Sequence, residues 1–201
     1  MDARIRHHRW VRSAEASSPA DPRVVAWSRA QFTARINDAM AIYVAAMGYP
    51  SHAGDQRALT ARRHVYNEGF TSRAAVLEDG TLVGFGYGYT TAPTQWWHDL
   101  VRKALSPDLA DAWLADSFEL SELHVLPEFQ GRGVGRRVLR ALAGDLENAA
   151  ILLSTPDADT RAMRLYRELG FVDLRRHYLF PGDARPFAVL GARLPFGTDG
   201  H

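Results

Sequence analysis

Apolar and polar positions along the chain fall into short segments that predict an α/β protein. Residues 74–77 and 82–90 are mainly apolar and flank Asp79-Gly80, which is typical of a β-hairpin. Residues 118–126 predict another strand. Residues 133–148 predict a helix, because apolar side chains recur there at four-residue steps: Val134, Val138, Leu142 and Leu146.

The C-terminal part continues the alternation of strands and helices. Residues 151–154 predict a short buried strand, and residues 159–169 predict a helix that Gly170 ends. Two further strands are expected at 171–180 and 186–194, around the turn PGDAR. This order indicates a mixed α/β sheet with a central βαβ unit, whose crossover should be right-handed.

The N-terminal part is predicted to be helical. Asp21 and Pro22 resemble an N-cap and a first helical residue, so a helix is expected from there to about Met47. The segment GYPSHAGD interrupts it, and residues 56–67 predict a second helix. Residues 91–116 predict an irregular, partly helical excursion.

Two of the expected strands have irregular patterns. Within 82–90 one face carries almost no side chains, which marks either a bulge or the close approach of another backbone or a ligand; its alternating residues are Gly84, Gly86 and Gly88. Within 118–126 the apolar positions change face, which fits either a bulge or burial on both sides. The residues involved are Phe118 and Leu120 on one face and Leu123 and Val125 on the other.

Composition and charge narrow the class of protein. The 201 residues fit one domain, with residues 1–20 expected as a flexible N-terminal segment. The 24 basic and 23 acidic residues give a net charge of +1, so no strong positive field favours nucleic acid or an anionic membrane. The start MDARIRHHRW is followed by no long apolar stretch, so neither a signal peptide nor a membrane span is expected.

Cysteine is absent from the sequence, which excludes disulfides, thiolate zinc sites and a cysteine nucleophile. The other potential ligands show no spacing typical of a metal centre, so no metal is predicted. A chain without disulfides suits a reducing compartment, and we expect it in the cytoplasm.

The loop LHVLPEFQGRGVG, residues 123–135, has the composition of an anion site. It joins an expected strand to the start of an expected helix, where backbone N–H groups and the helix dipole favour negative charge. Its glycines let the backbone approach a phosphate closely, and three arginines add positive charge: Arg132, Arg136 and Arg137. Neither the Walker A pattern nor the dinucleotide fingerprint fits, so a different phosphate compound is expected.

Two motifs then resemble the GCN5-related N-acetyltransferase (GNAT) family. Residues 125–135, VLPEFQGRGVG, are similar to its Q/R-x-x-G-x-G/A signature with the preceding V-x-P. Residues 159–171, DTRAMRLYRELGF, are similar to its N-x-x-A-x-x-L-Y-x-x-x-G-F segment. The resemblance covers about residues 118–172 and implies a mostly antiparallel sheet flanked by helices. It also implies an acetyl-coenzyme A-dependent N-acetyltransferase that acts by direct transfer in a ternary complex, with a homodimer as a further expectation.

The resemblance assigns cofactor binding to named residues. The strand residues Leu123, His124 and Val125 should offer backbone groups to the pantetheine arm and the thioester oxygen. The loop should hold the pyrophosphate through Gln130, Gly131, Arg132, Gly133, Val134, Gly135 and Arg136. Asp159 stands where the family often has Asn, so it should cap the helix or contact the pantetheine arm.

Catalytic roles follow from the same resemblance. Tyr166 is the expected general acid for the departing thiolate; its apolar helix stripe also fits a core tyrosine. Glu119, which shares a strand face with Ser121, ranks first as base. Glu122 on the opposite face, shared with His124, ranks second, and both carboxylates also suit arginine partners. A water relay without a dedicated base is the remaining alternative.

The acceptor is expected to be the primary amine of a small molecule or peptide, bound between the N-terminal helices and residues 91–116. No motif identifies it. Two other functions fit the same fold. One is a sensor that binds acyl-coenzyme A without catalysis, and the other is a structural domain.

Overall fold

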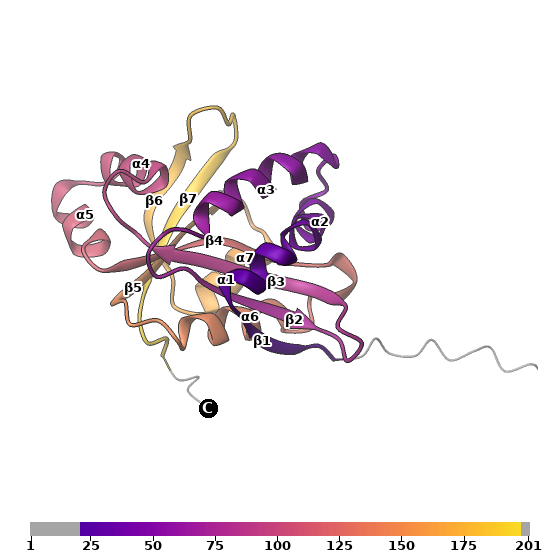
Figure 1. Ribbon diagram of the computed structural model, residues 1–201. Helices are drawn as coiled ribbons and strands as arrows, with labels where there is room; N and C mark the ends of the chain where they lie inside the picture. The colour runs from indigo at the N-terminus through magenta and orange to yellow at the C-terminus, as the bar shows by residue number, and fades with distance from the viewer. Residues whose placement is uncertain (1–20, 198–201) are drawn as a thin grey trace, which may run out of the picture.

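The computed structural model describes residues 21–197, and these form a seven-stranded sheet in the order β1-β2-β3-β4-β5-β7-β6 (Figure 1). The strands are β1 (Arg23–Trp27), β2 (Thr71–Val76), β3 (Leu82–Thr90), β4 (Ser117–Val125), β5 (Ala150–Pro156), β6 (Val172–Leu179) and β7 (Pro186–Arg193). The helices are α1 (Arg29–Ala34), α2 (Ile36–Met47), α3 (His52–His64), α4 (Trp96–Ala104), α5 (Pro107–Leu114), α6 (Val134–Ala143) and α7 (Arg161–Glu168), with a 3₁₀ turn η1 (Pro127–Phe129). The predicted flexible segment, residues 1–20, lies outside the described residues.

The sheet confirms the predicted mixed, mostly antiparallel architecture. Within residues 21–197, β4 and β5 pair in parallel and every other neighbouring pair is antiparallel. Helix α6 connects β4 to β5, which confirms the central βαβ unit. The predicted hairpin at β2 and β3 and the partly helical excursion at α4 and α5 are also present.

The helix expected from Asp21 onward is wrong at its start. Residues 23–27 instead form the edge strand β1, which pairs antiparallel with β2. The helix begins after Ser28, whose Oγ accepts the N–H of Gln31 at 3.2 Å, while Gln31 Oε1 accepts the N–H of Ser28 at 2.8 Å. This capping box is the true start signal. The β-branched pair Val24-Val25 fits a strand that packs against the sheet.

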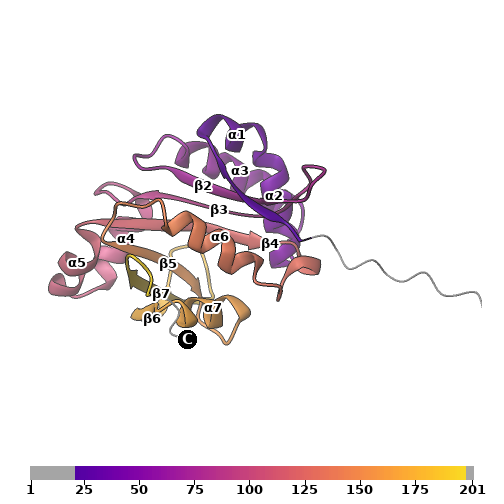
Figure 2. The same ribbon diagram turned by 90° about the horizontal axis from the view of Figure 1, so that it is seen from below.

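Helices cover both faces of the sheet (Figure 2). Helices α2 and α3 pack on one face of β3 and β4 around Phe85 and Tyr87, and α6 packs on the other face through Val138 and Leu139. Helices α4 and α5 contribute to a separate cluster with β5 and β7 that includes Trp97. This arrangement places the C-terminal end of α3 and the N-terminal ends of α6 and α7 around the middle of β4.

Strand β4 contains a β-bulge, which decides between the two alternatives for its changing face. Tyr87 pairs with Glu122 and Gly88 pairs with Leu120, so Ser121 is the extra residue. A bulge reverses the facing of every later side chain. Glu119 and Glu122 therefore lie on the same side of the sheet, and the prediction that they lie on opposite faces is wrong.

The glycine face of β3 is explained by this bulge. A Cβ atom on Gly88 would lie 1.9 Å from the carbonyl oxygen of Glu119 and 2.4 Å from the ring of Phe118. A Cβ on Gly86 would lie 3.1 Å from Val138 of α6. Both alternatives predicted for this face, a bulge and a close backbone approach, thus occur together.

The parallel pairing of β4 with β5 is short. It runs from Ser117 to Glu119 on β4 and from Ala150 to Leu152 on β5, and then the register ends. The later residues of β4 and the residues Ser154 and Thr155 of β5 line a common cleft.

Candidate active site

A cleft of about 1510 Å³ opens beside β4 and β5. Its walls come from α2 and α3 on one side and from α7 and the β6–β7 turn on the other. Of the predicted site residues, it is lined by Glu119, Glu122, Leu123, His124, Val125, Gln130, Gly131, Gly133, Val134, Gly135, Arg136 and Tyr166. The cleft therefore joins the phosphate-loop candidates to the catalytic candidates.

The glycine-rich loop has the backbone of an anion cradle. Gly131 and Gly133 have φ angles of 76° and 74°, a left-handed conformation that glycine adopts without strain. Gly133 precedes α6 directly and has no side chain to cap it, so the first N–H groups of α6 remain for a ligand in the cleft. A Cβ on Gly133 would meet no atom within 4 Å, so there is open space beside the loop.

Gln130 fixes this loop to the end of β4. Its Nε2 donates to the carbonyl of Val125 at 2.9 Å, and its Oε1 accepts from Arg161 Nη1 at 3.2 Å. Arg136 in the first turn of α6 pairs with Glu168 at the C-terminal end of α7. Gln130 thus links the loop, the strand and α7, the three elements that surround the expected cofactor.

Two predicted binding residues are placed outside the cleft lining. Arg132 is exposed and stacks over the ring of Phe129 at 5.6 Å. Asp159 is exposed and accepts a hydrogen bond from Arg164 at 2.5 Å. The predicted capping role of Asp159 is wrong, because Thr160 caps α7 and its Oγ1 accepts the N–H of Met163 at 3.0 Å.

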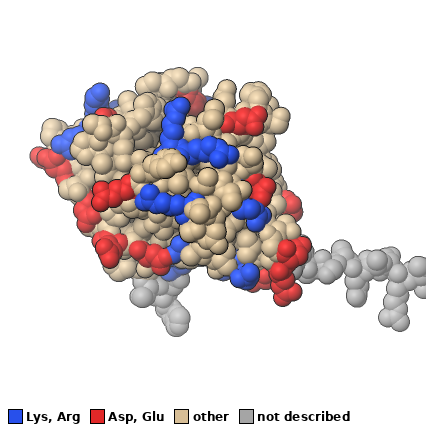
Figure 3. All heavy atoms as spheres, in the orientation of Figure 1, with Lys and Arg blue, Asp and Glu red and all other residues tan. Residues whose placement is uncertain are grey.

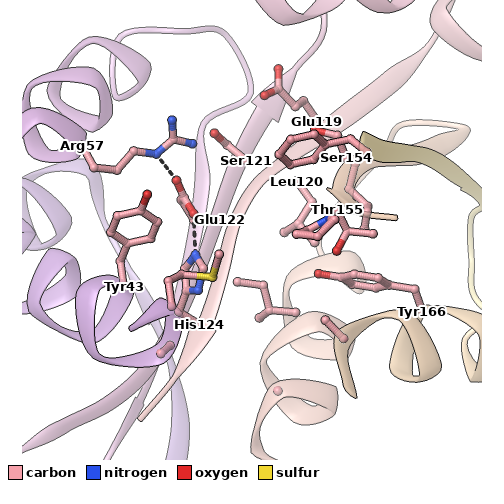
Figure 4. Close-up of a pocket in the computed structure, with 18 of the residues that line it drawn as sticks. Tyr43, Arg57, Glu119, Leu120, Ser121, Glu122, His124, Ser154, Thr155 and Tyr166 are labelled. Atoms are coloured by element: carbon pink, nitrogen blue, oxygen red, sulfur yellow. Dashed lines mark hydrogen bonds and ion pairs between the residues drawn. The ribbon is translucent and has the colours of Figure 1, made fainter. Parts of the chain in front are cut away.

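Glu122 is held as a carboxylate by two partners. Arg57 of α3 donates through Nε to Glu122 Oε1, and His124 Nε2 lies 2.5 Å from Glu122 Oε2 (Figure 4). Burial raises the pKa of Glu122, but Arg57 and the His124 hydrogen bond outweigh that effect and lower it to about 2. With both oxygens engaged, Glu122 is a poor proton acceptor.

Glu119 has the opposite environment. Its side chain is buried at 5% exposure, and its Oε2 has no hydrogen-bond partner. Burial raises the pKa of this carboxyl group to about 7, although Tyr89 and Arg57 both act to lower it. A carboxyl group with a free oxygen and a pKa near neutrality can accept a proton and release it again.

Tyr166 reaches the cleft from the side opposite to both glutamates. Its ring is buried and packs against Phe171 at a centroid distance of 5.4 Å. Its hydroxyl points into the opening beside β4 (Figure 4). Burial, and then the charge of Glu122, raise the pKa of Tyr166, so the phenol stays protonated. The ring therefore packs in the core while the hydroxyl lies at the cleft, and the role of Tyr166 as general acid stays a prediction.

The sequence did not single out several residues that complete this site. Arg57 and His64 come from α3, and Tyr89 comes from β3; all three line the cleft. Basic side chains also lie across the middle of one face of the molecule (Figure 3). Arginines that line the cleft are Arg57, Arg63, Arg136, Arg161, Arg164 and Arg185.

Residues 21–197 form neither a cluster of metal ligands nor a membrane-spanning helix. No group of three or more His, Cys, Asp or Glu side chains gathers there as a metal site would require. No helix of this part of the chain has the length and apolar character to cross a bilayer.

Comparison with known proteins identifies the class. The model of the Acetyltransferase (GNAT) family matches residues 36–171, which include both motifs and the whole of β4. The chain therefore belongs to the acetyltransferase (GNAT) family.

A curated relative shares much of this sequence, and solved structures share its fold. A GCN5-like protein acetyltransferase of Mycobacterium tuberculosis is 40% identical over 190 residues, covering 80% of this chain and 92% of the relative. The ribosomal-protein-S18-alanine N-acetyltransferase of Escherichia coli has the same fold, with a TM-score of 0.58 and 18% identity over 90% of this chain and 98% of its own. The yncA protein of Salmonella typhimurium, solved with acetyl-CoA, gives a TM-score of 0.58 and 16% identity over 90% and 99% of the two chains.

Proposed function

We propose that this protein transfers the acetyl group of acetyl-coenzyme A directly to a primary amine in a ternary complex. One observation carries the proposal. The glycine loop at the start of α6, the free end of β4 and the Tyr166 hydroxyl all border one cleft, which also contains Glu119. Acetyl-coenzyme A supplies an activated acyl thioester, and the cleft offers a separate group for each proton transfer.

The chain has suitable groups for the donor. The α6 N-terminus and the left-handed glycines Gly131 and Gly133 would hold the pyrophosphate. The residues of β4 beyond its pairing with β5, Leu123 to Val125, would present backbone groups to the pantetheine arm and the thioester oxygen. Coenzyme A use by the yncA protein supports this assignment. Arg132 and Asp159, which lie outside the cleft lining, are weaker candidates for contact.

Glu119 is the proposed base and Tyr166 the proposed acid. An acceptor ammonium must lose a proton before its nitrogen attacks, and Glu119, which lines the cleft and whose pKa burial raises to about 7, would accept it. Glu122 is the weaker candidate for this role, because Arg57 and His124 engage its two oxygens. The phenol of Tyr166, on the opposite side, protonates the departing thiolate.

The acceptor is proposed to be a primary amine of a protein, a peptide or a small molecule. The mycobacterial relative is described as a protein acetyltransferase, which favours a protein amine for the first tests. The homodimer, the cytoplasmic location and the absence of a metal stay predictions. Light scattering on the purified protein tests the first of these.

A thiol-release assay tests the proposal. The purified protein is given acetyl-coenzyme A with a panel of lysine peptides, N-terminal peptides and small amines, and acetylated products are identified by mass spectrometry. We expect thiol release that depends on an acceptor. Tight binding of acetyl-coenzyme A without transfer to any acceptor would instead support the acyl-coenzyme A sensor.

A further inference from the structure

Burial of Glu119 creates a problem for a base. Under the proposed function Glu119 takes one proton from the acceptor amine in every turnover. The proton must leave before the next turnover, yet the side chain is 5% exposed and Oε2 is fully covered. Direct release to water is therefore hindered, and a polar path from the carboxyl group is needed.

Such a path begins at Tyr89. Tyr89 of β3 pairs with Glu119 of β4 in the sheet, and burial together with the charge of this carboxylate raises the pKa of Tyr89. The Tyr89 hydroxyl lies 3.4 Å from Nε2 of His64, and the two rings meet edge to face at a centroid distance of 4.8 Å. Tyr89 is therefore in contact with both the buried carboxyl group and an imidazole.

The other nitrogen of His64 faces two hydroxyls. His64 Nδ1 lies 3.2 Å from the hydroxyl of Tyr87 and 3.3 Å from Oγ of Ser121, the extra residue of the β4 bulge. Ser121 is half-buried and lines the cleft with His64. Tyr89 thus faces Nε2 of His64, whereas Tyr87 and Ser121 face Nδ1, and Ser121 lines the cleft.

We propose that His64 and Tyr89 relay the proton of Glu119 to the open side of the cleft through Ser121. This inference rests on the proposed function. The protonated Glu119 gives its proton to the Tyr89 oxygen as Tyr89 passes its own hydroxyl proton to Nε2 of His64. The Nδ1–H of His64 then goes to Ser121 Oγ, whose hydroxyl proton goes to water. One proton leaves the amine and one reaches solvent, and Glu119 and Tyr89 return to their starting states. His64 is left as the other neutral tautomer, which exchange with water resets.

The surroundings of His64 suit a neutral relay. Burial and the nearby Arg57 lower its pKa to about 4, and Glu122 opposes them weakly, so the imidazole is uncharged at neutral pH. A neutral imidazole has one N–H donor and one bare acceptor nitrogen, as a relay requires. The titratable or charged groups around it are Arg57 and Arg63 of its own helix, Tyr87 and Tyr89 of β3, and Glu119 and Glu122 of β4.

The test removes the imidazole and then returns it from solution. In the full-length protein, His64→Ala should lower kcat at least about tenfold at pH 7, with the KM for acetyl-coenzyme A within about twofold of wild type. Added imidazole should restore part of kcat, and the loss should shrink at higher pH, where hydroxide and buffer accept the proton. His52→Ala is the matched control, because His52 is exposed at the start of the same helix and does not line the cleft; it should behave like wild type.

Tyr89→Phe provides a second variant should His64→Ala fold poorly by circular dichroism. Tyr89→Phe should lower kcat to a similar extent. The double variant with His64→Ala should have a kcat close to that of either single variant, because both substitutions interrupt one path. A kcat of His64→Ala within about twofold of wild type, or a loss that imidazole and pH leave unchanged, overturns the relay and leaves the proposed function intact. Absence of thiol release by the wild-type protein overturns both.

Discussion

Replacing the proposed base should stabilise the protein at alkaline pH. The folded state holds the pKa of Glu119 near 7, against an ordinary 4.5, because burial penalises the charged form. As pH rises from about 4.5 to 7, the unfolded chain loses its proton first, so the folded state loses stability. At about 1.36 kcal/mol per pH unit, this loss reaches about 3 kcal/mol above pH 7. Glu119→Gln, which has no charge, avoids it.

The measurement is the free energy of unfolding in urea at pH 5 and pH 8, followed by tryptophan fluorescence. The difference between Glu119→Gln and wild type should move in favour of the variant by roughly 2 to 3 kcal/mol between these pH values. Any effect of the substitution on the free energy of unfolding that does not depend on pH cancels when the two pH values are compared. The same variant should lose about 100-fold or more in kcat.

Glu122→Gln is the matched control. The pKa of Glu122 lies below its ordinary value, so its stabilising effect is complete above pH 5 and is lost only as pH falls towards about 2. Its difference from wild type should therefore be unfavourable at both pH 5 and pH 8. A flat difference for Glu119→Gln between pH 5 and pH 8, or a stabilising effect of Glu122→Gln at pH 8, would refute the assignment of the two environments.

Three further substitutions test the geometry. Tyr166→Phe should lower kcat about 100-fold and leave the dissociation constant of acetyl-coenzyme A within twofold of wild type. The control Tyr66→Phe, at an exposed site outside the cleft, should change neither quantity. An unchanged kcat in Tyr166→Phe removes the phenol from the mechanism. In Gly133→Ala the empty loop should relax away from the left-handed backbone, which costs about 1 kcal/mol, and must recover that conformation to bind, so calorimetry should show about fivefold weaker acetyl-coenzyme A binding. Unaltered affinity would contradict a cradle that needs this backbone. Gly88→Ala should lower the free energy of unfolding by about 3 kcal/mol, because the added Cβ meets backbone of the bulged strand; an unaltered urea midpoint would show that β4 can move away.

The sequence predicted most strands and helices because their signals are local. The helix predicted from Asp21 is the exception. Asp21-Pro22 has the residue types of a helix start, but residues 23–27 pair with β2 and form a strand. The N-cap of α7 was likewise predicted at Asp159, whereas the structure has it one residue later, at Thr160. Both residue types cap helices well, so local chemistry could not separate them.

The catalytic candidates were found by motif, but their environments depend on contacts far apart in sequence. Arg57 and Glu122 are 65 positions apart, and nothing near either residue indicates the ion pair that makes Glu122 a poor base. The change of face in 118–126 did indicate an irregularity. Its consequence, both glutamates in one cleft, required the register of β3 against β4.

The short parallel pairing between β4 and β5 joins two halves of the sheet. Strands β1 to β4 with α2 and α3 carry Glu119 and the relay, whereas β5, β6 and β7 with α7 carry Tyr166. Three residue pairs of backbone join these halves within the sheet. A shared hydrophobic cluster of β4, α6, β5 and α7 also spans this pairing, so the separation between the proposed acid and the proposed base is set jointly by three backbone pairs and one patch of core. Packing along residues 117–119 and 150–152 therefore fixes how far apart the two proposed proton-transfer groups stand, although none of these residues except Glu119 is proposed to exchange a proton.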